Sequence, residues 1–321
     1  MSTAEVTSFE VLLAAPRGFC AGVERAIRTV ELALDSRAAG DERPVYVRHE
    51  IVHNKVVVDD LRARGAVFVE ETQEIPEGAT AVFSAHGIAP SVREEAAALG
   101  LVTLDATCPL VSRVHAAVLR YAGRGYTILF VGHAGHPEVE GVMGEAPARV
   151  ELIQSVADAE AVRVEDPTKL AYATQTTLSM DDVAAIVDAL RRRFPAMVGP
   201  EAGDVCYATT NRQEAVRALV EQHAADVVVV LGSPNSSNSN RLREVAELVG
   251  ARAYLVGTAA ELDPGWLEGA RRVGVTAGAS TPEHLVQALV DRLRSLGATG
   301  VKTVETREED VFFAPPPLKR S

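Results

Sequence analysis

The sequence predicts an α/β protein of three related α/β domains, each with a small and mostly parallel sheet, related by pseudo-threefold symmetry around a common centre. Three observations lead to this prediction. Strand-like runs alternate with amphipathic helical patterns, which is typical of parallel sheets covered by helices. A cysteine recurs at the same point of this pattern three times. The strand-like runs end in polar turns, and the carboxyl ends of parallel strands meet at one edge of a sheet.

Composition limits the class of protein. The chain of 321 residues is 47% hydrophobic and 24% charged, which is typical of a globular protein with more than one domain. It contains no run of about 18 apolar residues, and its first residues, MSTAEVTSFE, do not resemble a secretory signal. Three cysteines are too few for a disulfide framework, so we expect a reducing, cytoplasmic location. The net charge of −12 argues against nucleic acid and anionic membranes as partners.

The first repeated element is a cysteine between an apolar strand and a helix. In PRGFCAGVERAI, residues 16–27, Cys20 follows the apolar run VLLAA and precedes a helical pattern. Cys108 and Cys206 stand in the same position before their own helical segments, at intervals of about 90 and 100 residues, the size of a small domain. A lone cysteine is usually a small buried apolar side chain. Three equivalent cysteines, with no fourth in the chain, indicate one shared site instead.

Two strand-like segments with polar ends follow each cysteine. The nearer ones are RPVYVRHEIV, GYTILFVG and DVVVVLG, and the more distant ones lie in AVFSAHG, LAYATQTT and RVGVTAGAST. Because these strands are predicted to be parallel, their polar ends share the edge that carries the cysteines. The polar residues concerned are His49, His136 and Ser236 after the nearer strands, and His86, Thr176 and Ser280 after the more distant ones.

The repeat also sets the predicted domain boundaries. We expect an N-terminal strand that joins the third domain, three α/β domains that each follow a cysteine, and a C-terminal tail that contains the prolines of FFAPPPLKRS. The corresponding ranges are 1–20, 21–107, 108–205, 206–300 and 301–321.

Three thiolates from distant parts of the chain favour an iron–sulfur cluster. Structural zinc sites favour close CxxC pairs, and the sequence has none. A cubane cluster held by three cysteines leaves one iron open to bind substrate as a Lewis acid. The common centre is therefore predicted to be a cluster-binding cleft. Helix N-termini beside the cysteines would favour the thiolate form.

The segment HEIVH, residues 49–53, offers an alternative, because it matches the HExxH pattern of zinc hydrolases. That mechanism requires a helix, in which both histidines lie on one face. The surrounding residues, PVYVRHEIVHN, are rich in β-branched side chains and predict a strand. On a strand the two histidines would be about 13 Å apart, too far to bind one zinc ion.

Taken together, these segments resemble the LytB/IspH family of 4-hydroxy-3-methylbut-2-enyl diphosphate reductases. The resemblance covers nearly the whole chain, in the family's order. The matching segments are PRGFCAGVERAI, VRHEIVHNKVVVDDL, FSAHG, DATCPLVSRVH, GHAGHPEVEGVMGE, TQTTLS, CYATTNRQEAV, GSPNSSNSNRL and VTAGAST.

The resemblance implies a reductase that removes the hydroxyl of an allylic diphosphate as water with two electrons and two protons. This reaction is the last step of the methylerythritol phosphate route and yields isopentenyl and dimethylallyl diphosphate. The resemblance also implies an external electron donor such as ferredoxin or flavodoxin. A non-catalytic iron–sulfur redox sensor is the alternative, although a sensor has no need for so many diphosphate donors.

The resemblance assigns roles to individual residues as well. Cys20, Cys108 and Cys206 would ligate one [4Fe–4S] cluster whose fourth iron binds the substrate hydroxyl. Glu138 and Thr176 would deliver protons, and a carboxyl in a dry site can hold a proton near neutral pH. The diphosphate pocket maps onto His49, His86, His136, Ser236, Ser237, Asn238 and Ser280.

The residue types suit these roles. Protonated histidines would add charge to the diphosphate contacts, and Ser236 and Ser280 are expected at helix N-termini. Other polar residues of the same segments are expected to have supporting roles. Glu140, His133 and His53 would support the site, and Asn54, Thr209, Thr210 and Asn211 would cap helices or support the cluster.

Overall fold

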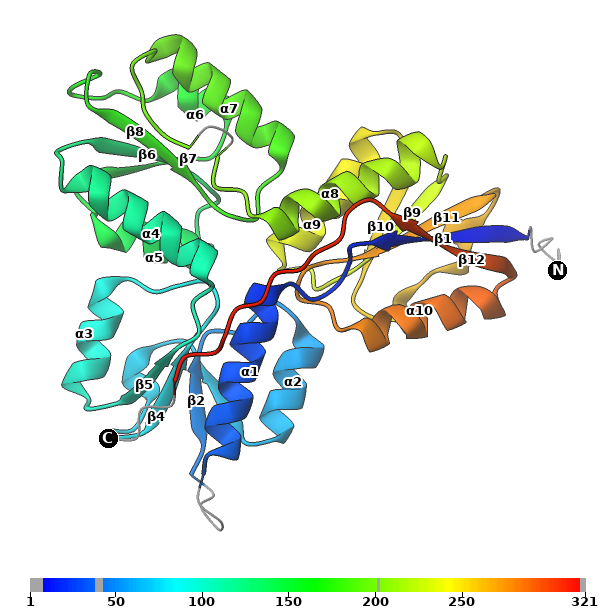
Figure 1. Cartoon of the computed structure of the whole chain (residues 1–321), viewed down its shortest axis with the longest axis horizontal. Helices are drawn as coiled ribbons and strands as arrows, with labels where there is room; N and C mark the ends of the chain where they lie inside the picture. Colours follow the sequence, from blue (N-terminus) through cyan, green and yellow to red (C-terminus); the bar gives the residue numbers. More distant parts are fainter. Residues whose placement is uncertain (1–7, 38–42, 201–202, 318–321) are drawn as a thin grey trace. The chain divides into compact units, whose positions relative to one another are not determined.

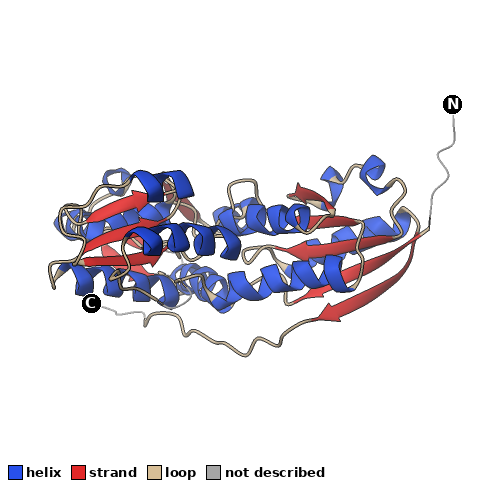
Figure 2. Cartoon of the chain, turned by 90° about the horizontal axis from the view of Figure 1, so that it is seen from above, coloured by secondary structure: helices blue, strands red, loops and turns tan. Residues whose placement is uncertain are grey.

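The computed structural model describes residues 8–37, 43–200 and 203–317. By its contacts the chain falls into two compact units: Met1–Cys20 with Tyr207–Val311, and Ala21–Cys206 with Phe312–Ser321. In each unit, helices flank parallel strands (Figures 1 and 2). The two ends of the chain, residues 1–7 and 318–321, belong to predicted segments but lie outside the described residues.

The first unit contains one five-stranded sheet with the order β10-β9-β11-β1-β12. Its neighbouring strands are all parallel. Its strands are β1 (Phe9–Ala15), β9 (Val227–Leu231), β10 (Arg252–Val256), β11 (Arg272–Ala277) and β12 (Ala298–Glu305). Its helices are α8 (Tyr207–Arg217), α9 (Ser237–Leu248) and α10 (Glu283–Ser295), with short helical turns at Ala218–Gln222, Ala259–Glu261 and Pro264–Leu267.

Strand β9 shows why this sheet is covered on both faces. Its sequence VVVVL is buried at every position. Alternate residues point to opposite faces of a strand. Val227 and Val229 therefore pack in the core that includes α10, whereas Val228 and Val230 pack in the core that includes α8 and α9. Figure 1 shows α10 on one side of the sheet and α8 and α9 on the other. A parallel sheet buried on both faces explains the continuous valine run.

The second unit contains two smaller sheets, with the orders β3-β2-β4-β5 and β7-β6-β8. Their neighbouring strands are also all parallel. The strands are β2 (Val45–Arg48), β3 (Ala66–Val69), β4 (Thr80–Phe83), β5 (Val102–Asp105), β6 (Thr127–Val131), β7 (Val150–Ile153) and β8 (Leu170–Thr174). The helices are α1 (Ala21–Asp35), α2 (Lys55–Ala63), α3 (Pro90–Ala98), α4 (Pro109–Ala122), α5 (Pro137–Glu145), α6 (Val156–Ala161) and α7 (Met180–Arg193), with a helical turn at Thr72–Glu74.

Strand β6 repeats the pattern of β9. Leu129 and Val131 pack in a core with residues of α6 and α7, and Ile128 and Phe130 pack in a core with residues of α4 and α5. Three small, all-parallel sheets with helices confirm the predicted α/β class. The pseudo-threefold grouping around a central cleft stays a prediction.

Strand pairing in the first unit bears on two of the predicted domain boundaries. Strand β1 pairs with β11 and β12, so the N-terminal strand joins the sheet of the third predicted domain. The predicted tail begins too early, because β12 continues to Glu305 and pairs with β1 along its whole length. Residues 306–317 contain neither helix nor strand (Figure 2). The division into three domains stays a prediction, since contacts group the chain into two units.

Candidate active site

The candidate residues of the second unit lie at the carboxyl ends of its parallel strands. Four of these strand ends carry a polar residue that the sequence singled out, and the segment after β5 leads to Cys108. The residues are His49 after β2, His86 after β4, His136 and Glu138 after β6, and Thr176 after β8.

Three histidines of this unit form one cluster. The ring centroids of His53 and His86 are 4.2 Å apart in a stacked arrangement. His136 stands edge-on to both, at 5.4 Å from His53 and 5.6 Å from His86. The structure thus brings together His86 and His136, which the resemblance placed in one pocket. His53, which was expected to have only a supporting role, is in contact with both rings.

Burial disfavours the protonated forms of His49, His86 and His136, contrary to the expectation of protonated rings. Burial, together with the neighbouring His53 and His133, lowers the pKa of His136 to about 3. The pKa of His86 lies well below its ordinary value because of burial and the nearby His53 and His136. Burial and the charge of Arg48 also lower the pKa of His49. Bringing a proton onto these rings therefore requires an anion beside them.

The segment HEIVH is a loop, which corrects the predicted strand. Strand β2 ends at Arg48, and His49 has a φ of 60°, in the left-handed region that breaks a strand. Asn54 accepts hydrogen bonds from the backbone N–H groups of Val56 and Val57, so it caps α2 as expected. Because His49 and His53 share no helix, the zinc-hydrolase geometry is absent from this described segment.

Glu138 and Thr176 form a buried pair. Glu138 lies in the first turn of α5 and is only 1% exposed. The backbone N–H of Thr176 donates to Oε1 of Glu138 at 2.7 Å, and the Thr176 hydroxyl donates to Oε2 at 2.9 Å. Burial raises the pKa of the Glu138 carboxyl to about 7, although the two hydrogen bonds oppose this shift. The carboxyl can therefore hold a proton near neutral pH, as the sequence led us to expect.

His136 is bound to the same turn. As the N-cap of α5 its Nδ1 accepts a hydrogen bond from the Glu138 backbone N–H at 3.1 Å. The neutral ring consequently carries its proton on Nε2 and can donate it to a ligand. Glu140, in the same turn, is exposed.

Gln175 is a residue that the sequence did not single out. It is fully buried, its Oε1 accepts from the backbone N–H of His133 at 3.1 Å, and its Nε2 donates to the Thr177 hydroxyl at 3.0 Å. It thereby joins the turn that carries Glu138 to the turn that carries Thr176. Its position inside the TQTT segment was the only available signal.

The three cysteines have the same backbone environment. Each stands directly before a helix, α1, α4 or α8, is partly exposed, and is not in a disulfide. Each also donates its backbone N–H to a turn that carries a candidate residue of another predicted repeat or of the sheet that it joins. The acceptors are the carbonyls of Ala279 for Cys20 at 3.3 Å, Ala85 for Cys108 at 3.0 Å and Thr176 for Cys206 at 3.0 Å.

In the first unit, Asn238 connects the candidate residues. Its Oδ1 accepts from the backbone N–H of Ala279 at 2.9 Å, and its Nδ2 donates to the Thr209 hydroxyl at 3.4 Å. Asn238 lies in the first turn of α9, whose N-cap is Ser236. The turn of Ser236 and the turn of Ser280 are therefore fixed to each other, as a shared ligand site requires.

One expectation for the first unit is wrong: Ser280 is not at a helix N-terminus, because α10 begins at Glu283 with Pro282 as its N-cap. Thr209, Thr210 and Asn211 do not cap a helix, because they lie inside α8, and their support for the cluster stays a prediction. Ser236, by contrast, caps α9 as expected: its hydroxyl accepts from the backbone N–H of Ser239 at 3.3 Å.

Among the described residues, no group of three or more His, Cys, Asp or Glu side chains is placed to hold a metal ion. Cys20 belongs to the first unit, and Cys108 and Cys206 belong to the second. Within residues 8–37, 43–200 and 203–317, no helix has the length and apolar character that crossing a bilayer demands.

Comparison with known sequences points to one family. Residues 11–294 match the family described as LytB protein. The chain is 56% identical over 318 residues to the 4-hydroxy-3-methylbut-2-enyl diphosphate reductase of Bordetella bronchiseptica, which covers 98% of this chain and 96% of the relative. It is 58% identical over 307 residues to the enzyme of the same name from Azoarcus sp., which covers 96% of each chain.

Solved structures agree with the sequence comparison. The E-1-hydroxy-2-methyl-but-2-enyl-4-diphosphate reductase of Plasmodium falciparum superposes with a TM-score of 0.90 at 38% identity, covering 95% of this chain and 94% of that one. A second structure is described as (E)-4-hydroxy-3-methyl-but-2-enyl diphosphate reductase, the terminal enzyme of the non-mevalonate pathway. It superposes with a TM-score of 0.61 at 31% identity, covering 89% of this chain and 99% of that one. The chain therefore belongs to the LytB family of 4-hydroxy-3-methylbut-2-enyl diphosphate reductases.

Proposed function

We propose that the chain reduces (E)-4-hydroxy-3-methylbut-2-enyl diphosphate with Glu138 and Thr176 as its proton-delivery residues. Family membership gives the reaction: two electrons and two protons remove the allylic hydroxyl as water and leave isopentenyl or dimethylallyl diphosphate. This is the terminal step of the non-mevalonate route to isoprenoids. The observation that carries the proton-delivery role is the buried Glu138–Thr176 pair, whose carboxyl has a pKa of about 7.

The proton path follows from the two hydrogen bonds of this pair. When Glu138 is protonated on Oε2, that proton can be donated to the Thr176 hydroxyl, which lies 2.9 Å away. The Thr176 hydroxyl is then free to pass its own proton onward to the substrate. The backbone N–H of Thr176 holds Oε1, so the carboxyl keeps one orientation during the transfer. A group with a pKa near the working pH is suited to general acid catalysis.

The diphosphate needs many donors, and both units supply them. In the second unit His49, His86 and His136 are neutral rings, each with an N–H to donate. A bound diphosphate would raise their pKa values, because a nearby negative charge favours the protonated form. In the first unit the donors are Ser236, Ser237, Asn238 and Ser280.

The three cysteines fit a [4Fe–4S] cluster in their chemistry. All three are partly exposed thiols that directly precede helices, where the N-terminal helix dipole favours a thiolate. Each has its backbone fixed to a turn with a candidate substrate residue. When bound by Cys20, Cys108 and Cys206, the cluster would supply the two electrons and an open iron for the substrate hydroxyl. We further propose an external donor such as ferredoxin or flavodoxin, and a cytoplasmic location.

The test is anaerobic purification of the full chain followed by turnover. We expect brown protein with about four irons and four sulfides per chain. An artificial one-electron donor and the allylic diphosphate should then yield both isoprenoid diphosphates. A protein that carries the cluster and binds diphosphate but forms no product would contradict the enzyme and favour a redox sensor. A colourless, fully active protein with one bound zinc ion would contradict the cluster.

A further inference from the structure

Arg212 is the largest fully buried side chain in the described part of the protein, and it lies on the helix that follows Cys206. It is 0% exposed, and its guanidinium has five N–H groups that all need acceptors. A buried charge that lacks partners is strongly unfavourable. The acceptors that Arg212 contacts therefore identify the segments that its buried charge holds together.

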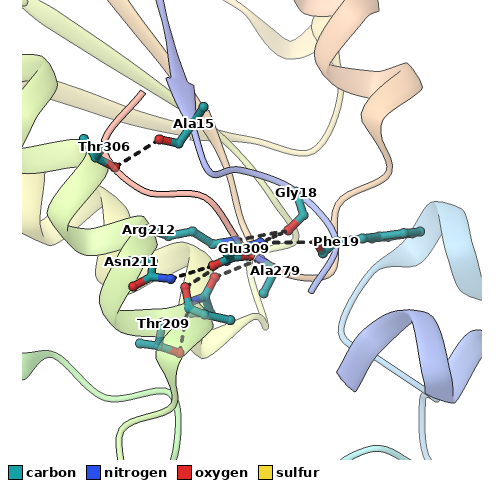
Figure 3. Close-up of polar contacts among 11 residues, drawn as sticks. Ala15, Gly18, Phe19, Thr209, Asn211, Arg212, Ala279, Thr306 and Glu309 are labelled. Atoms are coloured by element: carbon teal, nitrogen blue, oxygen red, sulfur yellow. Dashed lines mark hydrogen bonds and ion pairs between the residues drawn. The ribbon is translucent and has the colours of Figure 1, made fainter. Parts of the chain in front are cut away.

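The guanidinium of Arg212 holds the loop that leads to Cys20 (Figure 3). Its Nε and Nη2 donate to the carbonyl of Gly18 at 3.1 and 2.8 Å. Nη2 also donates to the carbonyl of Phe19 at 3.2 Å. Gly18 has a φ of 65°, which only glycine adopts readily, and a Cβ there would lie 3.0 Å from the carbonyl of Thr281. The loop before Cys20 is thus held by its carbonyl groups as well as by the backbone of Cys20.

The remaining donors of Arg212 bind its own helix and the segment after β12. Nη1 donates to the carbonyl of Ala208 at 2.9 Å and to Oε1 of Glu309 at 3.0 Å. Nη2 reaches Oε2 of Glu309 at 3.3 Å. Asn211 adds a hydrogen bond to Oε1 of Glu309 at 2.9 Å, and Thr306 of the same segment donates to the carbonyl of Ala15 (Figure 3). Glu309 is therefore the carboxylate that balances the Arg212 charge and fixes its direction.

The second unit repeats this arrangement around Cys108. Arg25, on the helix that follows Cys20, donates from Nη1 to the carbonyl of Thr107 at 2.8 Å and from Nη2 to that of Asp105 at 3.3 Å. Its Nε donates to the carbonyl of Ala314, again in the C-terminal segment, at 2.9 Å. In both cases an arginine after one cysteine holds the loop before another, and the segment after β12 accepts a further hydrogen bond from that arginine.

We propose that Arg212 and Arg25 are positioning residues for Cys20 and Cys108, and that the C-terminal segment, through Glu309 and Ala314, holds these arginines in place. The inference rests on the proposed function, in which both cysteines ligate the cluster. Neither arginine is among the residues proposed to bind the substrate or to ligate the cluster. Each acts by fixing the direction from which one thiolate is presented.

The first measurement uses cluster-free full-length protein, so that it does not depend on activity. Iodoacetamide alkylation of each cysteine is followed by peptide mass spectrometry in one sample. Glu309→Gln and Arg212→Lys should raise the alkylation rate of Cys20 by at least about fivefold, because local opening of its loop becomes easier, and leave Cys108 and Cys206 unchanged. Arg25→Lys should give the reverse pattern, with Cys108 alone accelerated.

A matched control lies on the same two elements. Arg307 of the C-terminal segment pairs with Glu214 of α8 at 3.3 Å, but both side chains are about half exposed, so Glu214→Gln should alter none of the three rates. The proposal would be overturned if the alkylation rates of all three cysteines rose equally. It would also be overturned if the Cys20 rate rose in neither Glu309→Gln nor Arg212→Lys.

The second measurement links positioning to the cluster. After anaerobic reconstitution, Glu309→Gln should lose iron to a chelator several-fold faster than wild type and Glu214→Gln, and Glu309→Asp should restore part of the difference. If wild type itself takes up no iron, the proposed function fails, while the alkylation pattern still decides whether the arginines position the loops. If wild type keeps its cluster and Glu309→Gln loses iron at the same rate, the positioning role for the cluster is wrong.

Discussion

The properties of Glu138 depend on two residues distant in sequence. The sequence indicated a polar turn around Glu138, and the structure places the residue in the first turn of α5. The partner Thr176 and the nearby Asp204, which both affect the Glu138 pKa, come from other strands and loops. Their spatial proximity could not be predicted from local pattern. The sequence thus indicated a protonatable carboxyl, and tertiary packing determines which atoms it binds.

Replacement of Glu138 by Gln tests its role in proton delivery. Gln keeps the size of the side chain and can still accept from Thr176, but it carries no transferable proton. We expect the single-turnover rate to fall roughly 10²–10⁴-fold, the usual size of a general-acid contribution. Affinity for the substrate should change little, because the diphosphate donors are untouched. Glu140→Gln, in the same turn but exposed, is the control and should keep the wild-type rate. A Glu138→Gln enzyme with normal turnover, or with weakened binding alone, would show that the proton comes from elsewhere.

The same carboxyl should leave a signature in the pH dependence of stability. Its pKa is about 7 in the folded protein and 4.5 as the ordinary value. The folded state therefore holds the proton more tightly, so Glu138 ionisation destabilises the fold as pH rises from about 4.5 to about 7, and the full penalty applies above that range. In urea unfolding of cluster-free protein, Glu138→Gln should gain stability relative to wild type between about pH 5 and pH 8. A difference between the two proteins that does not change with pH would contradict the raised pKa.

At the scale of elements, periodic patterns were predicted and turn geometry was not. The valine run of β9 and the helical pattern of α9 are fixed by local residues, and both lie where the sequence placed them. The loop at His49 was missed, because β-branched neighbours favour a strand while a left-handed residue ends it. The side-chain bridge from Asn238 to Ala279 was also missed, since it joins turns that lie about 40 residues apart in the chain.

Close packing against Ser239 explains two glycines of the first unit. A Cβ on Gly278 would overlap the Ser239 hydroxyl, and a Cβ on Gly232 would overlap both the hydroxyl and the Cβ of Ser239. The turns after β9 and β11 can therefore approach α9 only because they lack side chains at these points. This approach places Ser236 and Ser280 at the same edge of the sheet.

Gly278→Ala should accordingly destabilise the protein by about 1–3 kcal/mol, the usual effect of overpacking. Because the hydroxyl is the nearest obstacle, Ser239→Ala should recover much of this loss in the double variant. Gly232→Ala is the matched case. There the Cβ of Ser239 remains in the way, so Ser239→Ala should recover a smaller part of the lost stability. Urea unfolding of the wild type, the three single variants and the two double variants measures both couplings. Equal recovery at the two positions would contradict the packing described here.

At the scale of the whole molecule, the repeat predicted three domains, whereas contacts define two units. The first two predicted domains form one unit because α5 packs closely on the loop after β4. A Cβ on Gly144 would overlap the Ala89 side chain, and one on Gly141 would lie 3.3 Å from the His115 ring and the Gly87 backbone. His115 in turn lies 2.7 Å from the carboxylate of Glu145. Such contacts depend on small residues that recur with no period, so they could not be predicted from the sequence pattern.

All three cysteines are proposed to ligate one cluster, so each should be required for it. Cys20 belongs to the first unit and Cys108 to the second, yet the proposed cluster needs both. Cys20→Ser and Cys108→Ser should therefore each remove most of the iron and sulfide and nearly all activity, to a similar degree. Because the thiols are partly exposed and serine keeps the backbone N–H bonds to the neighbouring turns, cluster-free protein should change in stability by no more than about 0.5 kcal/mol.

Three measurements are made on each protein. They are anaerobic iron and sulfide analysis, turnover with an artificial electron donor, and urea unfolding of the cluster-free form. The stability reading separates a lost ligand from a lost fold, because a variant that fails to fold would lose iron without any role for its thiol. Either serine variant with a full complement of iron and the wild-type rate would remove that cysteine from the ligand set. Iron lost from one variant only would leave the remaining thiols to bind a cluster by themselves, in conflict with equivalent roles for the repeated cysteines.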